Sequence, residues 1–214
     1  MSDLHCPATL LVVRHGEATY AEPDLPSDEG GWLTDRGRQQ AADFSEGVRR
    51  RRVAAVYTSV LSRAVETGAI VADRLSVTSE PRPGLQEFAV GSYGGRPEGH
   101  DLIAAVFRRW LDDDLAADCP GGETARAVIE RFGAALRELA DLHRGETVVI
   151  VSHGGAMSLA IPRLCLNASA DLVRAHWVPN CAVAEVSVDA DRWLLQSWPG
   201  SRDPAAAGAD PPAG

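Results

Sequence analysis

The sequence predicts an α/β fold: a three-layer α/β/α sandwich whose central sheet is mostly parallel. Short apolar runs alternate along the chain with longer segments of helical periodicity, which is typical of a parallel sheet covered by helices on both faces. The chain has 214 residues, of which 45% are hydrophobic. That length is sufficient for one substantial core and too short for two comfortable domains.

The first elements follow from apolar runs and one helix start signal. Residues 9–13 (TLLVV) are short, apolar and β-branched, and they predict a buried strand. Thr34 and Asp35 form a helix start, and the spacing that follows predicts a helix over 35–50. A second apolar run, 53–59 (VAAVYTS), predicts the next strand.

Three further helices are predicted from apolar spacing. Residues 61–75 carry apolar side chains at helical intervals, and the Gly- and Pro-rich region 81–122 contains a helix marked by apolar residues over 102–110. The clearest helix covers 123–143, where one apolar stripe consists of Val128, Phe132, Ala135, Leu136 and Leu139.

The C-terminal part completes the sheet. Residues 147–152 (TVVIVS) predict a third buried strand, followed at once by a helical stretch through Leu164. Residues 181–188 and 192–198 alternate in polarity around a turn and predict a hairpin, which adds one antiparallel strand.

Residues 1–200 are expected to form one domain. Residues 201–214 are rich in Ala, Pro and Gly, a composition that cannot build a core, and we expect a disordered tail there.

Composition excludes several classes of function. The net charge of −9 and the pI of about 5.1 argue against nucleic-acid binding. No apolar run approaches the ~20 residues that span a bilayer, and the N-terminus does not resemble a signal peptide, so we expect no membrane association. Four scattered cysteines without a CxxC pair fit a cytoplasmic protein. The oligomeric state is not indicated.

Polar residues follow three of the predicted strands. Arg14 and His15 lie beyond the first strand, Arg63 follows the second after a short gap, and His153 follows the third. Ligands of open α/β sheets bind beyond the carboxyl ends of the strands. We therefore expect these side chains to meet in one site, although a single RHG could arise by chance and a lone histidine after a strand is more often structural.

The residue types favour phosphate chemistry. Arginine forks suit phosphate oxygens, and histidine can attack or exchange protons near neutral pH. Gly154 and Gly155 open a helix, whose amides and positive end would face the same space. Glu87 lies in a glycine-rich loop and could supply a mobile carboxyl group. No HxxxH or HExxH pair is present and the arginines would repel a cation, so we expect no metal and no other cofactor.

Seven blocks of sequence occur in an order that resembles a known family. They are LLVVRHGE (10–17), LTDRGRQQA (33–41), YTSVLSRAVETGAIVA (57–72), LQEFAVGSYGG (85–95), PGGET (120–124), VVIVSHGGAM (148–157) and VPNCAVAEV (178–186). The chain resembles the histidine phosphatase superfamily, in its phosphoglycerate-mutase-like branch, over roughly residues 9–198.

The resemblance implies a role for each residue at the strand ends. His15 would attack phosphorus and form a phosphohistidine, while Arg14, Arg63 and His153 would hold the phosphoryl oxygens. Glu87 would protonate the leaving alkoxide and then take a proton from the attacking water. The expected protein is a metal-independent phosphomonoesterase with a small phosphorylated metabolite as its partner. The alternatives are a cofactor-dependent phosphoglycerate-type mutase and a catalytically weak protein that binds phosphorylated ligands.

The sequence departs from the family pattern after the RHGE motif. Many members carry a hydroxyl residue and an Asn that help to bind phosphate, and this chain has Ala18 and Ala21 there. Thr19 or Tyr20 could compensate. Other matching positions are expected to cap helices and anchor loops, namely Thr34, Thr67, Glu123 and Asn180. Candidates for the substrate mouth, for which a structural role is the favoured alternative, are Tyr93, Arg96, His100 and Trp110.

Overall fold

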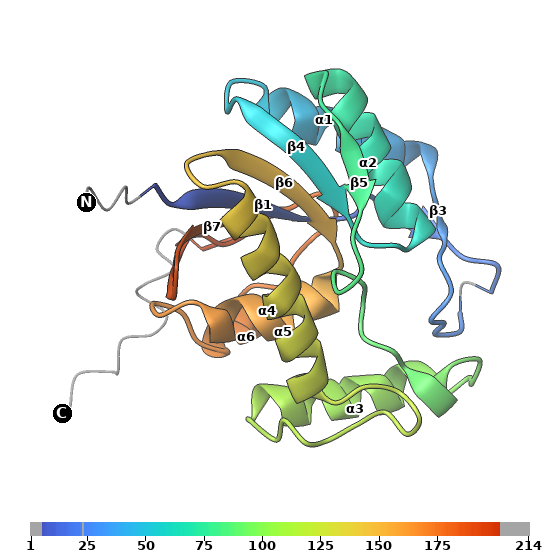
Figure 1. The fold of residues 1–214 in the computed structure, drawn as a ribbon. Coiled ribbons are helices and arrows are strands. Elements are labelled where there is room, and N and C mark those ends of the chain that lie inside the picture. Colours follow the sequence, from blue (N-terminus) through green and yellow to red (C-terminus); the bar gives the residue numbers. More distant parts are fainter. Residues whose placement is uncertain (1–5, 23, 202–214) are drawn as a thin grey trace.

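A six-stranded sheet forms the centre of the protein in the computed structural model, which describes residues 6–22 and 24–201 (Figure 1). Its strand order is β5–β4–β6–β1–β7–β8. The strands are β5 (Ser79–Pro81), β4 (Val53–Thr58), β6 (Thr147–Ser152), β1 (Ala8–Arg14), β7 (Val183–Asp189) and β8 (Arg192–Ser197). β7 pairs antiparallel with both neighbours, so it alone opposes the direction of the other five. The predicted sheet with one antiparallel strand is confirmed.

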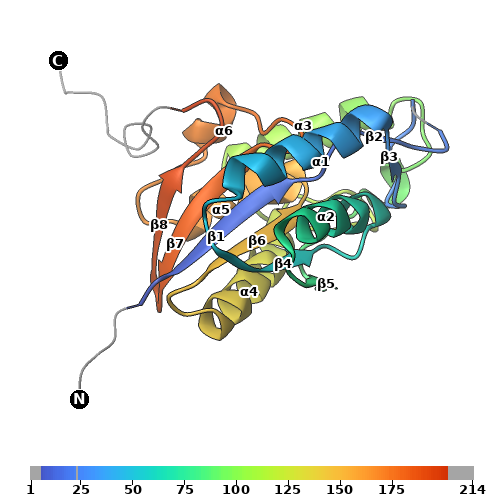
Figure 2. The ribbon, with the colours of Figure 1, turned by 90° about the horizontal axis from the view of Figure 1, so that it is seen from above.

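Successive side chains of β1 pack alternately into two separate hydrophobic clusters, one on each face of the sheet. Leu10 and Val12 pack with α4 (Ala125–Leu142) and α5 (Gly154–Leu164), whereas Leu11 and Val13 pack with the opposite pair of helices. That opposite pair is α1 (Asp35–Val48) and α2 (Ser62–Leu75). Figure 2 shows α1 and α2 in front of the sheet and α4 and α5 behind it. The three-layer arrangement is thereby confirmed.

The helix starts follow the capping signals in the sequence. Thr34 caps α1 by accepting a hydrogen bond from the Gly37 amide at 3.0 Å. Thr124 caps α4 in the same way through the Ala127 amide. The predicted stripe on α4 is buried at Val128, Phe132, Leu136 and Leu139 and partly buried at Ala135.

Several short elements were not predicted. They are β5, the two-residue strands β2 (Ala18–Thr19) and β3 (Trp32–Leu33), the 3₁₀ turn η1 (Gly91–Tyr93) and the helix α6 (Asp171–Ala175). Each is too short for a hydrophobic period to be recognised.

Helix α3 (Gly99–Leu111) lies beyond α4 and α5 and is anchored by Trp110 (Figure 1). The Trp110 side chain is fully buried, and its indole donates a hydrogen bond to the Ala117 carbonyl at 2.8 Å. The structural role that was favoured for Trp110 is therefore confirmed, and the alternative at the substrate mouth is wrong, because its ring fills the core beneath α3.

Two predictions stay predictions. Apart from Ser201, the expected disordered tail lies outside the described residues, so the limits of the domain at 1–200 are not tested. Within the described ranges no helix is both long and apolar enough to cross a bilayer, and the cytoplasmic location stays a prediction.

The glycines of two sequence motifs pack against each other. A Cβ atom on Gly16 would lie 2.5 Å from the Gly37 carbonyl oxygen, and one on Gly37 would overlap the Glu17 carbonyl. The Glu17 amide donates to Gln40 Oε1 at 2.7 Å, and Thr34 Oγ1 donates to the Glu17 carboxylate at 2.9 Å. The segment 33–41 therefore holds the RHGE loop from behind.

This close approach predicts that alanine substitutions at two glycines of α1 will have different effects on stability. Gly37→Ala should lower the free energy of unfolding by about 1–3 kcal/mol, because the added methyl group meets rigid backbone. Gly47 lies in the same helix with nothing within 4 Å of an added Cβ. Gly47→Ala should therefore leave stability unchanged or raise it by about 0.5–1 kcal/mol. Urea unfolding measures both, and equal effects would show that α1 does not press on the RHGE loop.

Candidate active site

The register of the sheet brings the two candidate histidines together. Arg14 on β1 is paired with Ser152 on β6, so His15 and His153 leave the sheet side by side. Their ring centroids lie 5.1 Å apart. Arg63, in the first turn of α2, reaches over them and donates from Nε to His15 Nε2 at 3.1 Å. A cavity of about 330 Å³ opens above His15, and Arg14, Arg63 and Glu87 also line it.

The hydrogen bonds of His15 define its tautomer. Its Nδ1 lies 2.7 Å from the Gly16 carbonyl oxygen, which can only accept, so Nδ1 carries the proton. Nε2 is left with a lone pair, in agreement with its acceptance of the Arg63 hydrogen bond. Asn180 donates to the His15 carbonyl at 3.0 Å, and the Gly16 amide donates to Thr67 Oγ1 at 3.1 Å. Asn180 and Thr67 thus anchor the loop, as predicted from their positions.

His15 is uncharged at neutral pH. The residue is 4% exposed. Burial is the largest cause that lowers its pKa, to about 3, and the positive charges of Arg63 and Arg14 act in the same direction. The hydrogen bond to Gly16 opposes them but does not reverse the shift. A neutral imidazole whose lone pair is on Nε2 has the form that a nucleophile requires.

Two buried nitrogens beside His15 have no hydrogen-bond partner among the described residues. They are Arg14 Nε and His153 Nδ1. Arg14 is held through Nη1, which donates to the Val178 carbonyl at 2.9 Å. Burial, followed by the charge of Arg63, lowers the pKa of His153 well below its usual value. The arrangement leaves donors available for an oxyanion next to the His15 lone pair.

The helix end after His153 holds a carboxylate. Glu87 accepts hydrogen bonds from the amides of Gly155 at 2.9 Å and Ala156 at 2.6 Å. The amides of Gly154 and Gly155 were expected to face a ligand, and the Gly155 amide instead donates to the Glu87 carboxylate. The absence of a side chain at Gly154 lets Arg14 pack closely, because a Cβ there would lie 3.2 Å from Arg14 Cδ and Nε. The part of Gly154 in substrate binding stays a prediction.

Arg131 on α4 fixes the loop that carries Glu87. Its guanidinium donates to the carbonyls of Gly84 and Gln86 at 2.8 Å each, and to the Glu87 carbonyl at 3.1 Å. A bidentate ion pair with Glu123 orients it, and Glu123 also accepts from the Ala89 amide. Arg131 was not predicted, because a single polar residue on a helix carries no signal for contacts with residues more than forty positions away.

The other sequence candidates divide between the site and its surroundings. Tyr20 lies against the site, with its ring centre 5.5 Å from the Arg63 guanidinium carbon, and His100 lines the cavity. Thr19 and Arg96 are exposed and line none of the cavities described here, and Tyr93 packs against the core. No group of three His, Cys, Asp or Glu residues in the described ranges is arranged to hold a metal.

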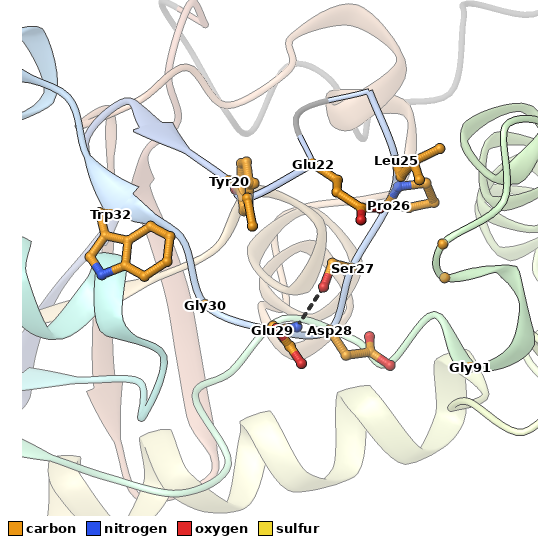
Figure 3. A pocket seen from close by; sticks show the side chains of 13 residues that line it. Tyr20, Glu22, Leu25, Pro26, Ser27, Asp28, Glu29, Gly30, Trp32 and Gly91 are labelled. Carbon is orange, nitrogen blue, oxygen red and sulfur yellow. Dashed lines mark hydrogen bonds between the residues drawn. The ribbon is translucent and has the colours of Figure 1, made fainter.

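A second hollow of about 370 Å³ lies beside the site (Figure 3). Tyr20 and Trp32 contribute aromatic rings to its wall, and Glu22, Asp28 and Glu29 are also among its lining residues. None of the five catalytic candidates lines it.

Comparisons with known proteins agree on one family. A model of the histidine phosphatase superfamily (branch 1) matches residues 10–200. Phosphoglycerate mutase-like protein 4 of Arabidopsis thaliana is 30% identical over 89% of this chain and 84% of its own length. A probable phosphoglycerate mutase, GpmB, of Yersinia pestis is 28% identical over 88% of this chain and 89% of its own length.

Solved structures show the same fold. A mycobacterial glucosyl-3-phosphoglycerate phosphatase is 25% identical with a TM-score of 0.75, covering 90% of this chain and 99% of its own. An alpha-ribazole-5′-P phosphatase of Escherichia coli, described as putative, is 25% identical with a TM-score of 0.71, covering 88% and 94%. With a family model that spans nearly the whole described chain, and with the motifs in family order, the protein belongs to the histidine phosphatase superfamily.

Proposed function

We propose that the protein is a metal-independent phosphomonoesterase that hydrolyses a small phosphorylated metabolite through a phosphohistidine on His15. The observation that carries this proposal is the neutral, buried His15, whose Nε2 lone pair lies beside two arginines and unpaired donors. Membership of the family and the phosphatases among the structural neighbours support phosphatase activity.

In the first step the Nε2 lone pair attacks phosphorus and the bond from phosphorus to the alcohol oxygen breaks. Arg14 and Arg63 receive the phosphoryl oxygens in their forks. Ser59 Oγ accepts from the Leu61 amide and lies 2.6 Å from His153 Nε2. A Ser59 hydroxyl that donates to Nε2 leaves the ring proton of His153 on Nδ1, and Nδ1 then donates a hydrogen bond to a third phosphoryl oxygen.

Glu87 moves the protons in both steps. It gives a proton to the leaving oxygen, and the carboxylate that remains is stabilised by the amides of Gly155 and Ala156. In the second step this carboxylate takes a proton from water, which attacks phosphorus and returns the electron pair to His15 Nε2.

The role of Glu87 predicts a dependence on the leaving group. Glu87→Gln should lower kcat/KM for alkyl phosphates by about 10²–10⁴-fold, because their alkoxides need a proton to leave. The loss on p-nitrophenyl phosphate should be far smaller, since nitrophenolate leaves without one. Glu130→Gln, on the exposed side of α4, is the matched control and should change neither rate. Equal losses on both esters would assign the acid to another residue.

A mutase is the second candidate. One of the relatives reported above is named a probable phosphoglycerate mutase, and another is named a phosphoglycerate mutase-like protein. Such an enzyme must exclude water while its phosphorylated substrate turns around in the pocket. Between Glu87 and Pro120 this chain has only η1, α3 and loops to close the pocket. The His15 cavity also continues into a neighbouring recess, with which it shares Arg14 and Glu87. An open pocket favours attack by water.

A ³¹P NMR time course on 2-phosphoglycerate, with bisphosphoglycerate as primer, separates the two activities. We expect inorganic phosphate to accumulate with little formation of 3-phosphoglycerate, and EDTA to have no effect. Rapid interconversion of the isomers without phosphate release would overturn the hydrolase and establish the mutase.

A further inference from the structure

An apolar recess adjoins the His15 cavity at Arg14 and Glu87. Its volume is about 430 Å³, which is within the range of small-molecule sites. Phe88, Ile103, Phe107 and Trp177 form its walls, and Arg14 and Glu87 line it where it meets the His15 cavity. No step of the hydrolysis described above uses these walls.

The aromatic walls are built from three separate segments. The ring of Phe107, on α3, lies 5.9 Å from the Trp177 ring in an edge-on arrangement and 6.1 Å from that of Phe88. Trp177 follows α6, and a Cβ on Gly154 would lie 3.3 Å from its ring. The Trp177 side chain is therefore placed between α3 and the start of α5, although Trp177 is 51% exposed. An aromatic residue left half exposed at the wall of a pocket is available to a ligand.

Most of the residues that line the recess are apolar. Arg14 and Glu87 belong to the catalytic end, and the other titratable side chains on its wall are His100 and Arg108, both from the exposed side of α3. A glycerate or sugar lying against Phe88, Phe107 and Trp177 would lose hydrogen bonds to water that these rings cannot replace. An apolar group placed there would instead gain by leaving water.

We propose that this recess binds the alcohol portion of the substrate, and that this portion is apolar and aromatic. The inference rests on the proposed function, because Glu87 must face the leaving oxygen and the alcohol then extends past it into the recess. The substrate class is a phosphate monoester of an aryl-substituted alcohol rather than of a glycerate or a sugar.

The test compares two alkyl esters, 2-phenylethyl phosphate and glycerol 3-phosphate. The wild-type enzyme should favour the phenylethyl ester in kcat/KM by about tenfold or more. Trp177→Ala should lower kcat/KM for the phenylethyl ester alone and so bring the ratio of the two values close to one. Trp177→Phe should keep most of the preference for the phenylethyl ester. Trp32→Ala is the matched control, because Trp32 is 57% exposed and lies outside the recess. It should leave the ratio unchanged.

A preference for glycerol phosphate, or an equal loss on both esters in Trp177→Ala, would overturn the assignment of the recess. Failure of the hydrolase is a different result, namely no phosphate release from either ester. Calorimetric titration with the non-hydrolysable 2-phenylethylphosphonate separates the two failures. If the recess binds the aryl group, Trp177→Ala should weaken this binding by about tenfold whether or not the esters are cleaved, and unchanged binding would contradict the proposal.

Discussion

The burial of His15 beside two guanidinium groups is the constraint on which the rest of the site depends. In that position a protonated imidazole would lose its hydration and face like charges, so the ring stays neutral and its pKa falls to about 3. The Gly16 carbonyl then assigns the proton to Nδ1 and leaves the lone pair on Nε2. The same positive charges that keep His15 neutral would attract a phosphate dianion, so one electrostatic arrangement would both prepare the proposed nucleophile and bind its target.

The sequence motifs position the side chains of the site mainly by holding the backbone near His15 and Glu87. Gly16 and Gly37 allow α1 to press on the RHGE loop, and Asn180 holds the His15 carbonyl. On the opposite side of the cavity, Arg131 holds the carbonyls around Glu87 while the first turn of α5 holds its carboxylate. Glu87 and His15, the proposed acid and nucleophile, are thus fixed by contacts with different helices.

The sequence predicted the main strands and helices because each carries its own periodic apolar pattern or cap. It also placed Arg14, His15, Arg63 and His153 together, since parallel strands end at one edge. It could not predict β5 or α6, which are too short to show a period, nor the burial of Trp110, which depends on how α3 docks. Arg131 and the amides that hold Glu87 were also missed, because contacts between distant segments have no local signature.

The central claim is that a neutral His15, protonated on Nδ1, attacks phosphorus through Nε2. The most direct measurement is the position of phosphate in rapidly quenched enzyme, by ³¹P–¹⁵N correlation NMR on histidine-labelled protein denatured in base. The account predicts one acid-labile, base-stable phosphate on Nε2 of His15. Phosphate on Nδ1 of His15 or on His153, or turnover without any phosphoenzyme, would contradict it.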